Sequence, residues 1–342
     1  MLRMIGGMRF AFPPYRRRRA EKRSAFRLLL LVGLLSAVPA RAERILVSNE
    51  KDNTISVLDG TTYAPVKTVT VGARPRGILL SSDGKELYIC TSDADHIEVL
   101  DLASYTVTRV LPSGPDPELF TLSPDGKTLY VANEDDNMVS VLDIAAAHIT
   151  TEIPVGIEPE GMAVSPDGKT LVNTSETTSM AHFIDTTTHQ PIANVLVDSR
   201  PRFAEFTSDG KQVWVSAEVG GTVSVVDTAT HKIIKKITFA IPGIAKESIQ
   251  AVGEAITPDG KLVFVALGPA NRVAVIDAQS FEVKKYLLVG QRVWHLAFSL
   301  DGKRLYTTNG VSNDISVIDV DDLKATKSVP VGAAPWGVVV AP

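Results

Sequence analysis

Apolar and polar residues alternate along the chain in short runs, and each run ends at residues that favour turns. The stretch from residue 118 to residue 159 shows the pattern clearly. It predicts four β-strands, at residues 118–123, 128–133, 138–143 and 149–154. Pro124-Asp125-Gly126-Lys127 separates the first two strands and predicts a tight turn, because proline presets φ and glycine tolerates positive φ. The stretch therefore predicts one small antiparallel sheet.

The triplet Asp-Gly-Lys shows that this four-strand unit repeats. Its aspartates are Asp83, Asp125, Asp167, Asp209, Asp259 and Asp301, at intervals of 42, 42, 42, 50 and 42 residues. Such a period indicates stacked repeats, and four strands per repeat are typical of a β-propeller blade. An aspartate that ends the third strand recurs seven times, at Asp59, Asp101, Asp143, Asp185, Asp227, Asp277 and Asp319. The sequence therefore predicts seven blades.

The two ends of the repeat region complement each other. The region begins with a second strand, at residues 44–49, and ends with a first strand, at residues 335–340, that has no partner after it. Joining the two would close the ring and leave no sheet edge at the seam. The predicted fold is all-β: a seven-bladed β-propeller of four-stranded antiparallel blades over residues 43–342, closed by the C-terminal strand.

Residues 1–42 have the order of a secretory signal peptide. A cationic stretch that includes Arg16 to Arg19 precedes an apolar run, Leu28 to Val38, and Ala40-Arg41-Ala42 has small residues where a signal peptidase cleaves. The apolar run is shorter than the roughly 20 residues of a membrane span. We therefore expect export to the periplasm and no membrane span after cleavage.

Cleavage would change the charge of the chain. The segment holds ten of the 35 Lys and Arg residues and one of the 39 Asp and Glu residues, so the remainder has 25 basic and 38 acidic residues, a net charge of −13. This balance disfavours nucleic acid as the main partner. Cys90 is the single cysteine, which excludes an internal disulfide and a thiolate metal cluster. Its position in a strand predicts a buried side chain.

The second strands carry a recognisable motif. Tyr130-Val131-Ala132-Asn133, Tyr88-Ile89-Cys90-Thr91 and Tyr306-Thr307-Thr308-Asn309 resemble the Tyr-Val-Thr-Asn (YVTN) β-propeller repeat family. The chain is similar in particular to the periplasmic members associated with catabolism dependent on pyrroloquinoline quinone (PQQ). That resemblance implies a pathway, with a quinoprotein dehydrogenase or a transporter component as partner, and PQQ as a candidate cofactor. It supplies no catalytic residue.

A binding site should lie where equivalent positions of the repeat differ, because structural positions recur. The starts of the first strands differ most, and they lie at one mouth of the central channel, where the loops between second and third strands also open. The predicted ligand-binding residues are Arg74, Arg76, Asp116, Glu118, Glu158, Glu160, Arg200, Arg202, Arg292, Trp294, His295 and Trp336. We expect acidic and basic sectors with the aromatic residues opposite. Arginine pairs could hold a carboxylate and tryptophan could stack on a planar ring.

Three interpretations of this mouth remain open. It could bind a small carboxylated molecule, serve as a docking face for a protein, or hold Arg–Glu pairs that only neutralise each other between blades. Ca²⁺ is a candidate ligand of the loop acids, although no calcium-loop motif is present and no metal site is predicted.

No catalytic residues are predicted. Only one histidine, His295, lines the mouth, and no nucleophile or carboxylate stands at a set spacing from it. The leading hypothesis is therefore a non-enzymatic binding or accessory protein for PQQ-dependent alcohol oxidation. The alternatives are a metal-dependent hydrolase resembling propeller lactonases, with Glu118, Glu160 and His295 as its candidates, and a pure interaction scaffold. The 50-residue interval adds an insertion at residues 239–252, a candidate lid or docking loop.

Overall fold

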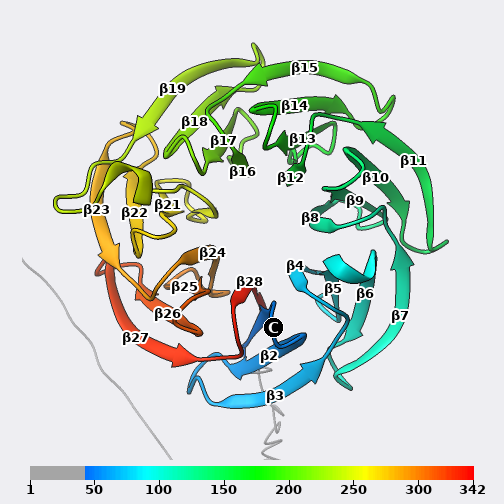
Figure 1. Ribbon diagram of the computed structural model, residues 1–342, viewed down its shortest axis with the longest axis horizontal. Helices are drawn as coiled ribbons and strands as arrows, with labels where there is room; N and C mark the ends of the chain where they lie inside the picture. Colours follow the sequence, from blue (N-terminus) through cyan, green and yellow to red (C-terminus); the bar gives the residue numbers. More distant parts are fainter. Residues whose placement is uncertain (1–42) are drawn as a thin grey trace, which may run out of the picture. The chain divides into compact units, whose positions relative to one another are not determined.

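Residues 43–342, which the computed structural model describes, form a ring of seven four-stranded sheets around a central channel (Figure 1). This confirms the predicted seven-bladed propeller. The predicted signal peptide, residues 1–42, lies outside the described residues. In every blade the first strand of the repeat is innermost and the fourth is outermost.

The strands of the blades share similar lengths, apart from one short inner strand. The inner strands are β4 (Pro75–Leu80), β8 (Pro117–Leu122), β12 (Pro159–Val164), β16 (Pro201–Phe206), β20 (Glu254–Ile256), β24 (Val293–Phe298) and β28 (Pro335–Ala341). The second strands are β1 (Arg44–Asn49), β5 (Glu86–Thr91), β9 (Thr128–Asn133), β13 (Thr170–Ser175), β17 (Gln212–Ala217), β21 (Leu262–Ala266) and β25 (Arg304–Asn309). The third strands are β2 (Thr54–Asp59), β6 (His96–Asp101), β10 (Met138–Asp143), β14 (Met180–Asp185), β18 (Thr222–Asp227), β22 (Arg272–Asp277) and β26 (Asp314–Asp319). The outer strands are β3 (Pro65–Thr70), β7 (Thr106–Pro112), β11 (His148–Pro154), β15 (Pro191–Leu196), β19 (Lys232–Thr238), β23 (Val283–Leu288) and β27 (Lys324–Pro330).

The C-terminal strand closes the ring as predicted. β28 pairs antiparallel with β1, with Leu46 opposite Val339 and Ile45 opposite Val340, and the red end of the chain lies beside its blue start (Figure 1). The blade at the seam therefore has the same four strands as the others. Two short 3₁₀ helices, η1 (Ser92–Ala94) and η2 (Lys246–Ser248), lie in connecting segments. Within residues 43–342, no helix is long and apolar enough to cross a membrane.

The repeated turns form for the reasons that the sequence indicates. In the turn after β8, Gly126 has a φ of +71°, and the Asp125 carboxylate accepts hydrogen bonds from the Ser123 hydroxyl (2.7 Å) and the Lys127 backbone N–H (3.2 Å). A side chain that bonds the backbone two residues on stabilises such a turn locally. The Asp-Gly-Lys repeat is therefore structural, and it lies at the opposite end of the inner strands from the predicted site.

Packing between blades depends on side-chain size at the third position of the inner strands. From blade to blade along the chain this position alternates between glycine and a larger residue, and two glycines meet at the seam: Gly77, Leu119, Gly161, Phe203, Gly253, His295 and Gly337. A Cβ atom on Gly77 would lie 2.4 Å from the Glu118 carbonyl oxygen of the next blade, so the backbones approach too closely there for any side chain. The large residues lie against these glycines, with Leu119 next to Gly77, Phe203 next to Gly161 and His295 next to Gly253. Cys90 is fully buried in β5, as predicted.

The insertion precedes the one short inner strand, β20. Its Phe239 and Ile249 are buried against the core cluster around Trp214 and Val263. Ile241 and Ile244 pack partly against the same cluster. The segment is therefore fixed to the blades by its apolar side chains rather than suspended over the channel.

Candidate functional site at the channel mouth

The same backbone conformation recurs just before the inner strands, mostly at residues that carry charged side chains of the mouth. The residue just before an inner-strand proline has a left-handed backbone conformation, and Arg292, which precedes Val293, has it too. The φ angle lies between +50° and +59° at Arg74, Asp116, Glu158, Arg200, Arg292 and Ala334. Asn53 and Asn137 accept the N–H groups of Arg74 and Glu158 at 2.9 and 3.1 Å. A left-handed residue with a side chain costs roughly 1–2 kcal/mol relative to the usual helical region. The asparagine hydrogen bonds stabilise this strained backbone conformation, which sets the direction in which each of these side chains leaves the backbone.

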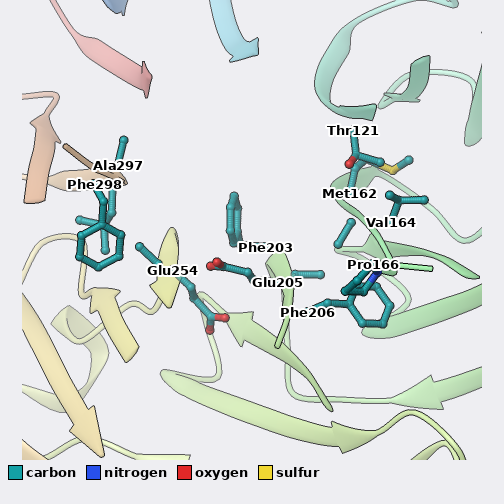
Figure 2. A pocket seen from close by; sticks show the side chains of 14 residues that line it. Thr121, Met162, Val164, Pro166, Phe203, Glu205, Phe206, Glu254, Ala297 and Phe298 are labelled. Carbon is teal, nitrogen blue, oxygen red and sulfur yellow. The ribbon is translucent and has the colours of Figure 1, made fainter. Parts of the chain in front are cut away.

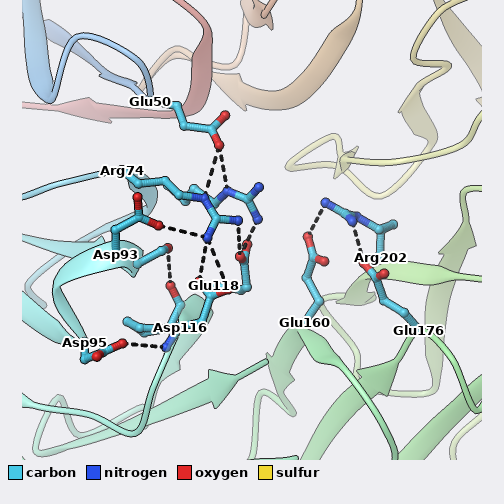
Figure 3. A network of polar contacts seen from close by, with 12 residues as sticks. Glu50, Arg74, Asp93, Asp95, Asp116, Glu118, Glu160, Glu176 and Arg202 are labelled. Carbon is cyan, nitrogen blue, oxygen red and sulfur yellow. Dashed lines mark hydrogen bonds and ion pairs between the residues drawn. The ribbon is translucent and has the colours of Figure 1, made fainter. Parts of the chain in front are cut away.

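The first cluster joins the blades of β28, β4 and β8 (Figure 3). The Arg74 guanidinium lies 2.9 Å from Asp116, 3.3 Å from Glu118 and 3.4 Å from Glu50. Arg76 contacts Glu50 at 3.2 Å and also forms an ion pair with Glu118. Asp93 adds a fourth carboxylate, 3.3 Å from Arg74. Two arginines are therefore surrounded by four acids.

The second cluster joins the blades of β12, β16 and β24. Arg202, whose side chain is 7% exposed, lies 2.8 Å from Glu160 and forms an ion pair with Glu176. Arg200 lies 2.7 Å from Glu176 and 3.1 Å from Glu218. Glu218 also accepts a hydrogen bond from Arg292 at 2.6 Å, and Arg292 in turn donates to the Gln250 side chain of the insertion. All five mouth arginines therefore have partners within the protein.

The buried acids differ in protonation. Burial raises the pKa of Glu118 to about 8, although Arg76 opposes the shift. Burial also raises the pKa of Glu160 well above its usual range, against the attraction of Arg202. Burial opposes the ionisation of Glu176 as well, but its interactions with Glu160, Arg202 and Arg200 outweigh burial and lower its pKa. Of the two acids that pair with Arg202, Glu160 therefore favours the protonated form and Glu176 the ionised form.

The aromatic residues do not form a separate sector opposite the charges, so that expectation was wrong. The Arg292 guanidinium lies 4.1 Å and that of Arg202 5.5 Å from the Trp294 ring centre. Arg76 lies 5.7 Å from the ring centre of Trp336, which is 1% exposed. Arginine stacks favourably on tryptophan faces, so the guanidinium groups take faces that we expected a planar ligand to use.

His295 is buried beneath this layer. Its ring centre lies 4.1 Å from that of Trp336 and 5.6 Å from that of Phe203. Burial, together with the nearby charges of Arg202 and Arg76, lowers the pKa of His295 to about 3. The imidazole is neutral at physiological pH and too weak a base for the general-base role that the lactonase hypothesis would give it.

The structure thus gives eleven of the twelve predicted residues an ion pair or a ring contact with another residue of the mouth. The twelfth, Glu158, lies at the rim and accepts a hydrogen bond from the Thr177 hydroxyl at 2.5 Å. Their assignment as ligand-binding residues stays a prediction. The mouth also uses loop residues outside that set: Glu50, Asp93, Glu176, Glu218 and Gln250. Comparing the loops between second and third strands from blade to blade identifies the four acids among them.

Two carboxylates without an arginine partner among the described residues, Glu134 and Glu158, lie beside paired acids on one side of the rim. Two trios of acids are close enough to share a cation, and Glu134 belongs to both. The first consists of Asp116, Glu118 and Glu134, and the second of Glu134, Glu158 and Glu176. In each trio one carboxylate oxygen per residue lies within 4.8 Å of the others. Among the described residues, no ion pair engages Glu134. This acidic rim is the part of the mouth with unused oxygen atoms.

Comparisons with known proteins support the fold. The sequence profile of the Cytochrome D1 heme domain family matches residues 87–202, from β5 to the start of β16. No curated protein matches this chain.

Three solved structures are similar over most of the chain. Hydrazine synthase from Kuenenia stuttgartiensis is 24% identical with a TM-score of 0.74, covering 80% of this chain and 92% of its own. A Bacteroides fragilis NCTC 9343 protein assigned as a 6-phosphogluconolactonase is 18% identical with a TM-score of 0.75, covering 90% and 99%. The dihydro-heme d1 dehydrogenase NirN in complex with DHE is 16% identical with a TM-score of 0.67, covering 86% and 74%. At these identities the likeness shows the propeller fold alone.

Proposed function

We propose that this chain is a non-enzymatic binding propeller of the periplasm that serves PQQ-dependent alcohol oxidation. The pathway and compartment rest on the YVTN resemblance and on the order of residues 1–42. Among residues 43–342, the mouth offers no nucleophile–base pair, and its one histidine is neutral and buried. What it does offer is a rigid, charged surface, which suits recognition better than chemistry.

The charge balance of the mouth carries the proposal, because it determines the kind of partner. Five arginines face nine carboxyl groups, those of Glu50, Asp93, Asp116, Glu118, Glu134, Glu158, Glu160, Glu176 and Glu218. Even with Glu118 and Glu160 protonated, the ionised carboxylates outnumber the arginines, so the mouth keeps a net negative charge. A carboxylated molecule such as PQQ would have to displace these acids from the arginines. The mouth therefore favours a basic surface, on a quinoprotein dehydrogenase or a transporter component, over a free carboxylated ligand.

Removing charge from the rim should slow association with such a partner. For Glu134→Gln and Glu158→Gln together we expect roughly a tenfold lower association rate with the organism's purified quinoprotein alcohol dehydrogenase at low salt, because electrostatic steering depends on the rim charge. Interferometry at low and high salt measures the rates. Glu282→Gln, which removes an exposed acid between β22 and β23 on the opposite face of the ring, is the matched control and should leave the rates unchanged.

Calorimetry with PQQ tests whether the mouth binds this carboxylated molecule rather than a basic protein surface. Strong heat with PQQ, abolished in Arg74→Gln, would support the carboxylate interpretation. No binding of either the dehydrogenase or PQQ would overturn the proposed function.

A haem cofactor fits this chain poorly. The matched family and NirN raise that candidate, and a haem needs an axial ligand such as histidine and room for its carboxylate side chains. The channel-facing histidine is packed between Trp336 and Phe203. The mouth above it carries surplus negative charge. We therefore derive no function through haem.

Metal-dependent hydrolysis is the second candidate, because the two acidic trios of the rim offer oxygen ligands of the kind that Ca²⁺ prefers. We expect millimolar Ca²⁺ to raise the melting temperature by about 2–4 °C, as binding at tenfold above its dissociation constant would. Glu134→Gln should abolish the shift, since Glu134 belongs to both trios, and Glu282→Gln should keep it. Turnover of a lactone panel by the Ca²⁺-loaded protein would favour the hydrolase, whereas stabilisation without turnover would leave the binding function.

A further inference from the structure

The other half of the central channel contains a cavity of about 440 Å³. Its lining comes from the inner strands of five blades, β8, β12, β16, β20 and β24. Phe203, Phe206, Phe298 and Met162 provide much of the surface (Figure 2). This size and this apolar lining are typical of small-molecule sites.

Two carboxyl groups occupy the cavity. Figure 2 shows Glu205 of β16 and Glu254 of β20 with their carboxyl groups next to each other. Glu205 accepts one hydrogen bond, from the Ile256 backbone N–H at 3.2 Å. Glu254 is 2% exposed, and neither of its carboxylate oxygens has a hydrogen-bond partner. Within residues 43–342, no ion pair engages either acid, in contrast to the acids of the mouth.

The repeat shows that the fold does not need these acids. The positions equivalent to Glu205 hold Leu79, Thr121, Ala163, Ala255, Ala297 and Val339. Those equivalent to Glu254 hold Ile78, Phe120, Met162, Ala204, Leu296 and Val338. Eleven of these twelve residues are apolar. The two exceptions to the pattern lie on adjacent blades and meet in one cavity.

Keeping this pair buried costs stability, because burial disfavours the charged form of each acid. The cost is expressed as pKa shifts: burial raises the pKa of Glu205 to about 8, and burial together with the Glu205 charge raises that of Glu254 well above its usual range. At neutral pH the pair therefore keeps at least one proton that an ordinary surface pair would have lost. Costly groups that the fold does not require are typical of binding sites.

We propose that this cavity binds a small organic cation with an apolar body, such as a primary amine that carries an aromatic or branched aliphatic group. The ammonium would supply the counter-charge that Glu205 and Glu254 lack, and the phenylalanine rings would contact the body and the cation. A metal ion fits less well, since the lining offers oxygen ligands from these two acids and Thr121, whereas Ca²⁺ needs six to eight. The cavity is separate from the mouth, so this inference does not depend on the proposed function.

Binding of an ammonium should release a proton from the pair, because the ligand replaces it as the counter-charge. The cavity lining contains no other ionisable side chain among the described residues. His295 of β24 packs above it against Phe203, and Arg202 lies beyond on β16, but the imidazole is neutral and the guanidinium stays charged between pH 6 and 8. Of the groups that line the cavity, only the two glutamates change charge in this range. Affinity should therefore rise with pH up to about 8.

Calorimetry with 2-phenylethylamine, and with the neutral isostere 2-phenylethanol, tests the proposal on the purified protein. We expect the amine to bind at least tenfold more tightly than the alcohol and about tenfold more tightly at pH 8 than at pH 6. Repeating the titration in buffers of different ionisation enthalpy should reveal the released proton. Glu205→Gln and Glu254→Gln should each weaken amine binding about tenfold without weakening that of the alcohol.

Two controls separate this site from the mouth and from misfolding. Glu134→Gln, which removes an acid from the rim, should bind the amine as the wild type does. Thermal melts should show both cavity variants to be at least as stable as the wild type. Equal affinity for amine and alcohol, binding unaffected by pH, or binding lost only in Glu134→Gln would overturn the proposal.

Discussion

Replacing Arg202 with methionine is expected to lower the free energy of unfolding by about 3–5 kcal/mol, the usual cost of removing one partner from a buried ion pair. The Arg202 side chain is 7% exposed and neutralises Glu160 and Glu176, each 1% exposed. Methionine would fill much of the space but leave two buried acids with less opposing charge. Glu160 would be affected most, since Arg202 is its only ion-pair partner among the described residues. Chemical denaturation at pH 8 measures the loss.

Arg200→Met is the matched control, because Arg200 pairs with acids of the same cluster but has a side chain that is 44% exposed. A solvated pair contributes about 0–1 kcal/mol, so this variant should lose far less. Adding Glu160→Gln to Arg202→Met should restore part of the stability by removing the stranded carboxylate. Equal losses for Arg202→Met and Arg200→Met would show that the cluster is solvated rather than buried.

The fold could be predicted almost completely because its determinants are local and repeated. Asp125, Gly126 and their equivalents form the same turn in each blade, so one correct strand–turn–strand assignment applies to all. All four strands predicted for the stretch from 118 to 159 start within one residue of their observed positions, and the second and third strands have their predicted bounds. Ring closure followed from strand counting, since β1 and β28 each lack a partner without the other.

The position of the mouth could be predicted from the sequence, but the ion pairs between its arginine and acidic side chains could not. Blade order places arginine positions beside acidic ones, yet the sequence does not specify rotamers. Arg202 could have pointed to solvent; instead it reaches Glu160 while its guanidinium also lies near the Trp294 ring. That choice decides whether the arginines are free to bind a carboxylate. Side-chain direction at a converging mouth depends on three or more blades at once, which periodicity does not encode.

At least one of the two cavity acids could have been found in the sequence by comparing equivalent positions of the inner strands. Comparing the strand starts identified the mouth, whereas the same comparison two to three residues further along identifies Glu205 as a polar exception. Glu254 is harder to find, because the insertion before it lengthens the interval to 50 residues and obscures the alignment of β20. Its equivalence to Met162 and Leu296 becomes clear from its pairing opposite Val265.

The same acids should make stability fall as pH rises. Below about pH 4.3 the Glu205 carboxyl is protonated in both the folded and the unfolded chain. Above it the unfolded chain releases the proton, whereas the folded chain keeps it up to a pKa of about 8. The folded state then binds more protons, so its free energy of unfolding decreases with pH through this window. Between pH 5 and pH 8 we expect Glu205 to account for a loss of about 2–3 kcal/mol, allowing for its partial exposure.

Glu205→Gln isolates this contribution, since the amide keeps the shape of the side chain and does not ionise. Glu118 and Glu160 at the mouth also have raised pKa values and add to the wild-type decline, but they are present in both proteins and cancel in the difference. Urea denaturation at intervals from pH 5 to pH 8 should therefore show the two stability curves diverging, with the variant more stable at the alkaline end. Glu282→Gln should follow the wild-type curve throughout. Parallel curves for Glu205→Gln and the wild type would mean that Glu205 is already solvated as a carboxylate, and a cavity that solvates its own charge would have no need of a cationic ligand.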